Sequence, residues 1–178
     1  MSDAFAVDLD SFSLCASTAD LGEEPAAREH ADLVEFRMDL ANDPSDALAD
    51  YDGDLPLLVT NRPHWEGGKT APFGRLDALA AAVEHEAVVA VDVELATLRG
   101  RPTGTNEIDA EELTVHARRH DAAIVASVHD FDGTPAPGTL DGLLREAAAA
   151  GDVGKLAVTA RTTGEALDLL AATHRATI

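Results

Sequence analysis

The chain has 178 residues, of which 46% are hydrophobic, and these values indicate a single globular domain over residues 1–178 with a sizeable core. Thirteen Lys and Arg residues stand against 33 Asp and Glu residues, so the formal net charge is −20. This charge disfavours nucleic acid as a partner, because phosphate binding needs a basic surface, and it favours a surface adapted to concentrated salt, where self-repulsion is screened.

Short apolar runs alternate with helical stretches along the whole chain. The runs predict six strands, at residues 11–16, 33–38, 57–62, 88–94, 122–129 and 153–159. Helices are expected at residues 23–30, 44–50, 73–85, 110–120, 140–149 and 162–173. The last helix opens with the capping-box pattern Thr162-x-x-Glu165, and residues 176–178 resemble the start of a seventh strand.

Strict alternation of strands and helices predicts parallel strands with right-handed crossovers. Two architectures fit this pattern. One is an open doubly wound sheet, and the other is a (β/α)₈ barrel of the TIM type, with about six βα units present and the last two strands missing. No glycine-rich phosphate loop follows the first strand, where many nucleotide-binding open sheets place one.

Cys15 is the only cysteine, which rules out an internal disulfide and fits a reducing compartment. It is expected to be a buried apolar residue of the first strand. The first thirty residues lack the basic and apolar regions of a signal peptide, and no apolar run is long enough to span a membrane. We therefore expect a cytoplasmic protein.

Five consecutive strands carry polar side chains near their C-terminal halves. Because side chains alternate between the two faces of a strand, these residues fall on one face of each strand. In a barrel those faces meet inside, at the end where active sites of this fold are found. Unpaired buried charge costs several kcal/mol, so the set needs pairing or a function. It comprises Glu35, Arg37, Asp39, Thr60, Arg62, Asp92, Glu94, Ser127, His129 and Lys155.

Lys155 is the candidate nucleophile. It lies in an apolar strand, where desolvation and nearby cations are expected to lower its pKa and leave free amine to attack a carbonyl. Arg37 and Arg62 could supply that field and grip a substrate carboxylate. The other interpretation of Lys155 is an ion-pair partner of Asp92 or Glu94.

His129 is the candidate proton carrier, because imidazole exchanges protons near neutral pH. The plainer alternative is a core histidine whose hydrogen bonds are satisfied. His116 and His120 have the four-residue spacing of a metal-binding pair, but the neighbouring Arg118 and Arg119 favour a solvated helix face. No metal site is therefore expected.

Five motifs now stand in order along the chain: E-x-R-x-D at residues 35–39, R-x-x-x-E-G-G at 62–68, D-x-E at 92–94, H-D-F at 129–131 and the lysine strand G-K-L-A at 154–157. Together with the helix residues 169–173, they resemble the type I 3-dehydroquinate dehydratases of the shikimate pathway. The resemblance implies a lyase that removes water from a small cyclic keto acid.

The resemblance also implies roles for individual residues. Lys155 would form an imine, or Schiff base, with the substrate ketone. His129 would remove the adjacent C–H proton and protonate the leaving hydroxyl, assisted by Glu66. No cofactor or metal would be needed, because the imine is the electron sink. The residues that would hold substrate hydroxyls and carboxylate are Glu35, Arg37 and Arg62.

Several alternatives stay open at this point. The family continues with two more strands that carry an arginine, a serine and a glutamine for substrate binding, and its first-strand serine could match Ser13 or Ser17. Another imine-forming barrel lyase, such as a class I aldolase, would share the lysine chemistry, and a truncated non-catalytic fragment would keep the same sequence. The oligomeric state is also open, with a homodimer among the forms that the sequence allows.

Overall fold

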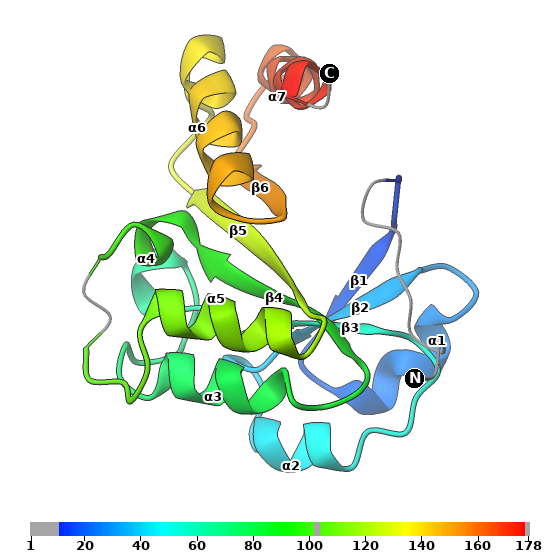
Figure 1. Ribbon diagram of the computed structural model, residues 1–178. Coiled ribbons are helices and arrows are strands. Elements are labelled where there is room, and N and C mark those ends of the chain that lie inside the picture. The colour runs from blue at the N-terminus through cyan, green and yellow to red at the C-terminus, as the bar shows by residue number, and fades with distance from the viewer. Residues whose placement is uncertain (1–10, 102–103, 177–178) are drawn as a thin grey trace.

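The structure is a computed structural model that describes residues 11–101 and 104–176. Six parallel strands pair in chain order, from β1 to β6, to form one sheet (Figure 1). The strands are β1 Cys15–Thr18, β2 Leu33–Arg37, β3 Leu57–Thr60, β4 Val88–Glu94, β5 Ala123–Asp130 and β6 Val153–Val158.

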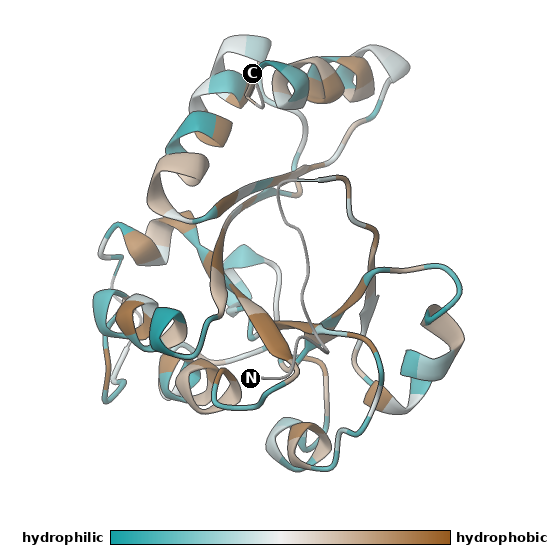
Figure 2. Cartoon of the chain, turned by 45° about the vertical axis from the view of Figure 1, so that its right-hand side comes forward, coloured by the Kyte–Doolittle hydropathy of each residue, from teal (hydrophilic) through white to brown (hydrophobic). Residues whose placement is uncertain are grey.

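The sheet curls so that most of its helices lie on the convex side and its other face turns inward (Figures 1 and 2). A doubly wound sheet reverses its strand order at a switch point, whereas here each strand pairs only with its neighbours in sequence. The sequential order and the curvature identify six βα units of a TIM-type barrel. The expectation of a TIM-type barrel with six βα units is thereby confirmed for the described residues.

The helices are η2 Leu21–Glu23, α1 Glu24–Ala27, α2 Pro44–Ala49, η3 His64–Glu66, α3 Arg75–Ala82, α4 Leu95–Leu98, α5 Ala110–Arg119, α6 Pro137–Ala150 and α7 Thr163–Ala176. Both halves of the predicted capping box are present, since Glu165 N donates to Thr162 Oγ1 and Thr162 N donates to a Glu165 carboxylate oxygen, each over 3.2 Å. A second box, Asp109 with Glu112, begins α5.

Some predicted boundaries were wrong. The first strand begins at Cys15, four residues later than predicted, and residue 176 ends α7 instead of starting a strand. Residues 177 and 178 lie outside the described part of the chain. The sequence also gave no hint of η3 and α4, because three or four residues are too few to show helical periodicity.

The main apolar core lies between the convex face of the sheet and the outer helices. Side chains from alternate strand positions, such as Val34, Phe36 and Val59, pack there against Leu79 of α3 and Leu113 of α5, and all five are fully buried. Burial of a large apolar side chain contributes about 2 kcal/mol, so this layer fixes the sheet on its helices.

The inner face has its own small apolar layer, formed by Leu33, Leu58, Ala90 and Val125 near the N-terminal ends of the strands. Because alternate residues share a face, the next inward positions along each strand lie directly above this layer. The polar residues of the inner face therefore lie next to this apolar layer, towards the C-terminal ends of the strands.

The β1 edge of the sheet is open to solvent. Cys15 and Ser17 are both exposed, so the expectation that Cys15 is buried was wrong. In the described part of the chain, β1 pairs only with β2, and this leaves its inward side chains uncovered. Among the same residues no helix has both the length and the apolar character needed to cross a membrane.

Candidate active site

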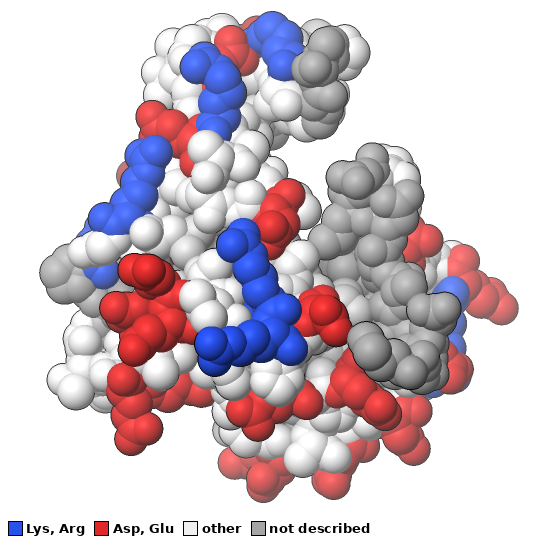
Figure 3. Space-filling view, viewed as in Figure 1, with Lys and Arg blue, Asp and Glu red and all other residues white. Residues whose placement is uncertain are grey.

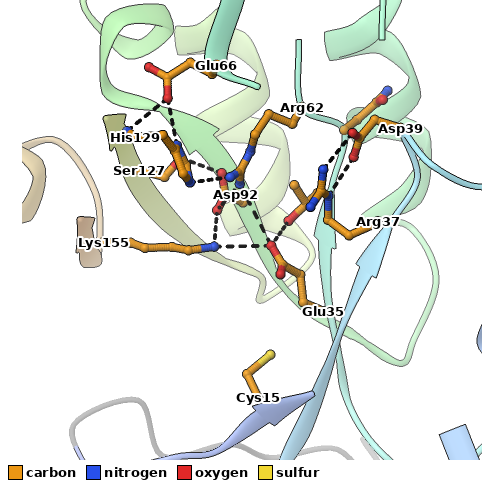
Figure 4. A network of polar contacts seen from close by, with 12 residues as sticks. Cys15, Glu35, Arg37, Asp39, Arg62, Glu66, Asp92, Ser127, His129 and Lys155 are labelled. Carbon is orange, nitrogen blue, oxygen red and sulfur yellow. Dashed lines mark hydrogen bonds and ion pairs between the residues drawn. The ribbon is translucent and has the colours of Figure 1, made fainter. Parts of the chain in front are cut away.

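The polar side chains of the inner face form a connected network (Figure 4). Strand register creates it, since Thr60 of β3 lies beside Asp92 of β4, and Ser127 of β5 lies beside Lys155 of β6. Asp92 and Ser127 are fully buried, and the Ser127 hydroxyl donates to Asp92 over 2.6 Å. The inward convergence predicted from the alternating pattern is therefore confirmed for these strands.

Lys155 lies between two carboxylates. Its Nζ is 3.0 Å from Asp92 Oδ2 and 3.2 Å from Glu35 Oε1, and its side chain is 32% exposed. Of the two ion-pair partners considered from the sequence, Asp92 contacts the lysine; Glu94 forms its ion pair elsewhere.

The expected lowering of the Lys155 pKa was wrong. Burial does lower it, but the negative charges of Asp92 and Glu35 outweigh burial and the nearby Arg62, so the pKa of Lys155 lies above its ordinary value. Without substrate, Lys155 is therefore a protonated ammonium group.

Glu35 is held in its charged form by the same contacts. Burial opposes ionisation, but the charge of Lys155 and hydrogen bonds from Thr60 and Ser17 lower the pKa of Glu35 to about 2. The Thr60 hydroxyl donates over 2.7 Å. Ser17, one of the two serines considered for the first strand, contacts Glu35, which it faces in the strand register.

Arg62 completes a balanced set of charges. It follows β3, is only 5% exposed, and places its Nη2 atom 2.9 Å from Asp92 Oδ2 and 3.9 Å from Glu35 Oε1. Two cations thus alternate with two anions, Lys155 and Arg62 with Glu35 and Asp92. Such pairing is what makes several partly buried charges tolerable inside a protein.

His129 joins this set to the loop after β3. Its Nδ1 atom lies 2.7 Å from Glu66 Oε2, and its backbone N donates to the same oxygen over 3.1 Å. Its Nε2 atom contacts Arg62. Because a guanidinium group can only donate, Nε2 accepts, and the ring proton is on Nδ1, where it is donated to Glu66. The basic nitrogen therefore faces the charged set.

Two glycines position Glu66 at the end of η3. Gly67 has a φ of +76°, in the left-handed region that favours glycine. A Cβ atom on Gly68 would overlap the carbonyl of Arg62, and the same carbonyl accepts a hydrogen bond from Thr70 N over 3.2 Å. The E-G-G pattern in the sequence is thus the mark of a tight loop that folds back on Arg62.

Arg37 lies beside the charged set without joining it directly. Its guanidinium makes two hydrogen bonds of 2.8 Å to Asp39, which also accepts from the backbone N of Lys69 over 3.2 Å. The Asp39 carboxylate raises the pKa of Arg37. The structure therefore brings together Lys155, Arg62 and Glu35 with His129 and Glu66, and it places Arg37 next to them on the same face.

A second ion pair behind the site was missed from the sequence. Arg75 and Glu94 are both fully buried, with Nη2 and Oε2 2.9 Å apart, and Thr97 donates to the same carboxylate over 3.1 Å. Arg75 also donates to the carbonyl of Asn61, directly before Arg62. No sequence signal marks Arg75, because an arginine at the start of a helix normally faces solvent.

Comparison with known proteins agrees with this geometry. The family model for type I 3-dehydroquinase matches residues 13–178. The chain belongs to the type I 3-dehydroquinase family. It is 53% identical over 169 residues to the 3-dehydroquinate dehydratase of Halobacterium salinarum, and 50% identical over 172 residues to that of Haloarcula marismortui. These matches cover 94% and 96% of the chain and 73% of each relative, so both relatives are longer than the chain.

Solved structures of the same family share the fold. The 3-dehydroquinate dehydratase of Geobacillus kaustophilus superposes with a TM-score of 0.74 at 28% identity, over 94% of this chain and 69% of that one. The enzyme of Enterococcus faecalis gives the same TM-score at 25% identity, over 92% and 73%. The family therefore accounts for both the sequential strands and the motifs that line them.

Proposed function

We propose that this chain catalyses the reaction of its family, the dehydration of 3-dehydroquinate to 3-dehydroshikimate in aromatic amino-acid biosynthesis, through an imine on Lys155. The observation that carries the proposal is the arrangement of Lys155 and His129. The lysine lies between two carboxylates on the inner face, and the histidine presents a basic nitrogen to the same charged set. Family membership supports the choice of substrate and makes an aldolase reaction the weaker alternative.

The first stage is formation of the imine. The Lys155 ammonium, whose side chain is 32% exposed, gives up a proton to solvent water, and the free amine attacks the substrate ketone. Loss of water leaves a positively charged imine in contact with the carboxylates of Asp92 and Glu35. They stabilise the cation before and after the reaction, which is consistent with a pKa of Lys155 above its ordinary value.

The second stage is elimination. His129 Nε2 takes a proton from the carbon next to the imine carbon, and the electron pair moves into the imine to give an enamine. The enamine then expels the hydroxyl one carbon further on, which leaves as water with the proton from His129. Hydrolysis of the imine returns Lys155. Glu66 accepts a hydrogen bond from Nδ1–H throughout the reaction and so stabilises the imidazolium form of His129.

Substrate binding falls to the remaining charged residues. Arg62 and Arg37 bind the carboxylate, and Glu35 accepts from substrate hydroxyls. None of these steps uses a metal or an organic cofactor. We also propose that the protein acts on a small-molecule substrate in the cytoplasm and has no nucleic-acid partner.

The test is a spectroscopic assay of the conjugated enoate product with 3-dehydroquinate as substrate. Lys155→Met should abolish product formation, whereas Lys69→Met should not, because Lys69 is exposed and its side chain lies outside the charged set. A full chain that folds, binds 3-dehydroquinate and forms no product would favour the non-catalytic reading. Equal turnover by Lys155→Met and the parent chain would refute the lysine mechanism.

A further inference from the structure

Three potential metal ligands meet on the outside of the barrel, away from the charged inner face. His116 is in the last turn of α5, His120 directly follows that helix, and Glu84 lies in the turn after α3. One ligand atom from each of the three lies within 4.8 Å of the others. The sequence showed the spacing of the two histidines, but only the fold brings a carboxylate to them.

The distances are close to those of a metal site. Zinc bonds of about 2.0 to 2.2 Å in tetrahedral geometry place neighbouring ligand atoms about 3.4 Å apart. His116 Nε2 and Glu84 Oε1 are 3.2 Å apart, and the rings of His116 and His120 have centroids 4.7 Å apart. Glu84 and His120 are exposed, so small side-chain rotations can bring their ligand atoms to metal-site separations without disturbing the core.

The supporting elements are well fixed. Helices α3 and α5 run side by side on the convex side of the sheet (Figure 1), and Leu79 and Leu113 anchor them in the core. The sequence argument for a solvated helix face rested on Arg118 and Arg119. Arg118 is paired with Asp152 over 3.2 Å, whereas Arg119 lines the same groove as His116 and Glu84.

The surrounding charge favours a cation. His116 and Glu84 line a shallow groove of about 780 Å³ between α3 and α5, in which Arg119 is the one positively charged lining residue. A groove lined mainly by negative charges raises the local concentration of cations. The acidic lining residues are Asp77, Glu84, Glu107, Asp109, Glu111 and Glu112.

We propose that Glu84, His116 and His120 bind one divalent transition-metal ion of the zinc type, which ties the turn after α3 to the end of α5. Two imidazoles select a borderline metal such as Zn²⁺, Co²⁺, Ni²⁺ or Cu²⁺ over Mg²⁺ and Ca²⁺, which prefer oxygen ligands. Three protein ligands leave a fourth position for water. The ion is structural, because it stands on the outer helices and not among the residues of the inner face.

The experiment is a calorimetric titration of the chelator-treated full chain with ZnCl₂ in buffer containing molar KCl. One ion per chain should bind. His120→Gln and Glu84→Gln should each raise the dissociation constant by more than about tenfold, since loss of even an indirect supporting group weakens metal sites by that much. His30→Gln is the matched control, because His30 is an exposed histidine on another element. Its dissociation constant should equal that of the parent chain.

A second measurement does not depend on the variants. Substoichiometric Cu²⁺ should selectively broaden the NMR signals of residues around His116 and His120 while leaving those around His129 sharp. The proposal is overturned if zinc fails to bind at about 100 μM, if binding is unchanged in both ligand variants, or if Cu²⁺ broadens other regions first. In those cases Glu84 and His116 form no more than a surface ion pair.

Discussion

Glu35→Gln tests the charged set of the inner face quantitatively. The pKa of the Glu35 carboxyl is lowered from 4.5 to about 2, and one pKa unit corresponds to about 1.4 kcal/mol, so charge on Glu35 stabilises the fold by about 3 kcal/mol near neutral pH. Its side chain is only 13% exposed, so solvent screening is small. Because the pKa is lowered by folding, this stability is present above the unfolded-state pKa of about 4.5 and is lost as the pH falls towards 2.

The assay is urea unfolding in molar KCl between pH 6 and pH 2.5. Across that range the parent chain should lose about 2 to 3 kcal/mol more stability than Glu35→Gln, whose amide cannot titrate but keeps the shape of the side chain. Glu29→Gln is the matched control, because Glu29 is exposed, and it should lose stability in parallel with the parent chain. If Glu35→Gln and the parent chain lose stability equally, Lys155, Thr60 and Ser17 do not hold Glu35 as described.

Three other perturbations test different parts of the account. His129→Ala should slow turnover by roughly 10² to 10⁴ and still allow imine formation, measured by single-turnover mass spectrometry. Normal turnover by this variant would show that His129 is not the proton carrier. Gly68→Ala should lower the free energy of unfolding by about 1 to 3 kcal/mol and reduce turnover, because its Cβ overlaps the Arg62 carbonyl, whereas Gly138→Ala, with open space around it, should leave turnover unchanged. The net charge of −20 should lower the thermal midpoint in dilute buffer relative to molar KCl, and equal midpoints would contradict a salt-adapted surface. Figure 3 shows the acidic groups of one face on which that repulsion acts.

The fold was largely predictable from the sequence, because two simple periodicities carry it. Alternation along a strand identified which side of β2, β4 and β6 faces inward, so the sequence alone predicted that Glu35, Asp92 and Lys155 lie close together. The periodicities alone did not separate a barrel from an open sheet, because that difference depends on which strands pair and not on their composition. The family resemblance is what indicated the barrel.

The electrostatics of the site were harder to predict. The sign of the Lys155 pKa shift depends on two carboxylates within about 3 Å, and the register of three strands sets those distances. The partner of Glu94 depends on where α3 begins, since Arg75 enters the interior from the first turn of that helix. Strand alternation alone placed Glu94 next to Asp92 and gave no indication of this separate pair.

The most direct test of the central claim is borohydride reduction of the full chain in the presence of 3-dehydroquinate, followed by peptide mass spectrometry. We expect one reduced ligand attached to Lys155 and none on Lys69, the other lysine of the chain. His129→Ala should give the same adduct, because imine formation precedes the proton transfer assigned to that residue. An unmodified Lys155 in a folded chain that binds 3-dehydroquinate would contradict the imine mechanism.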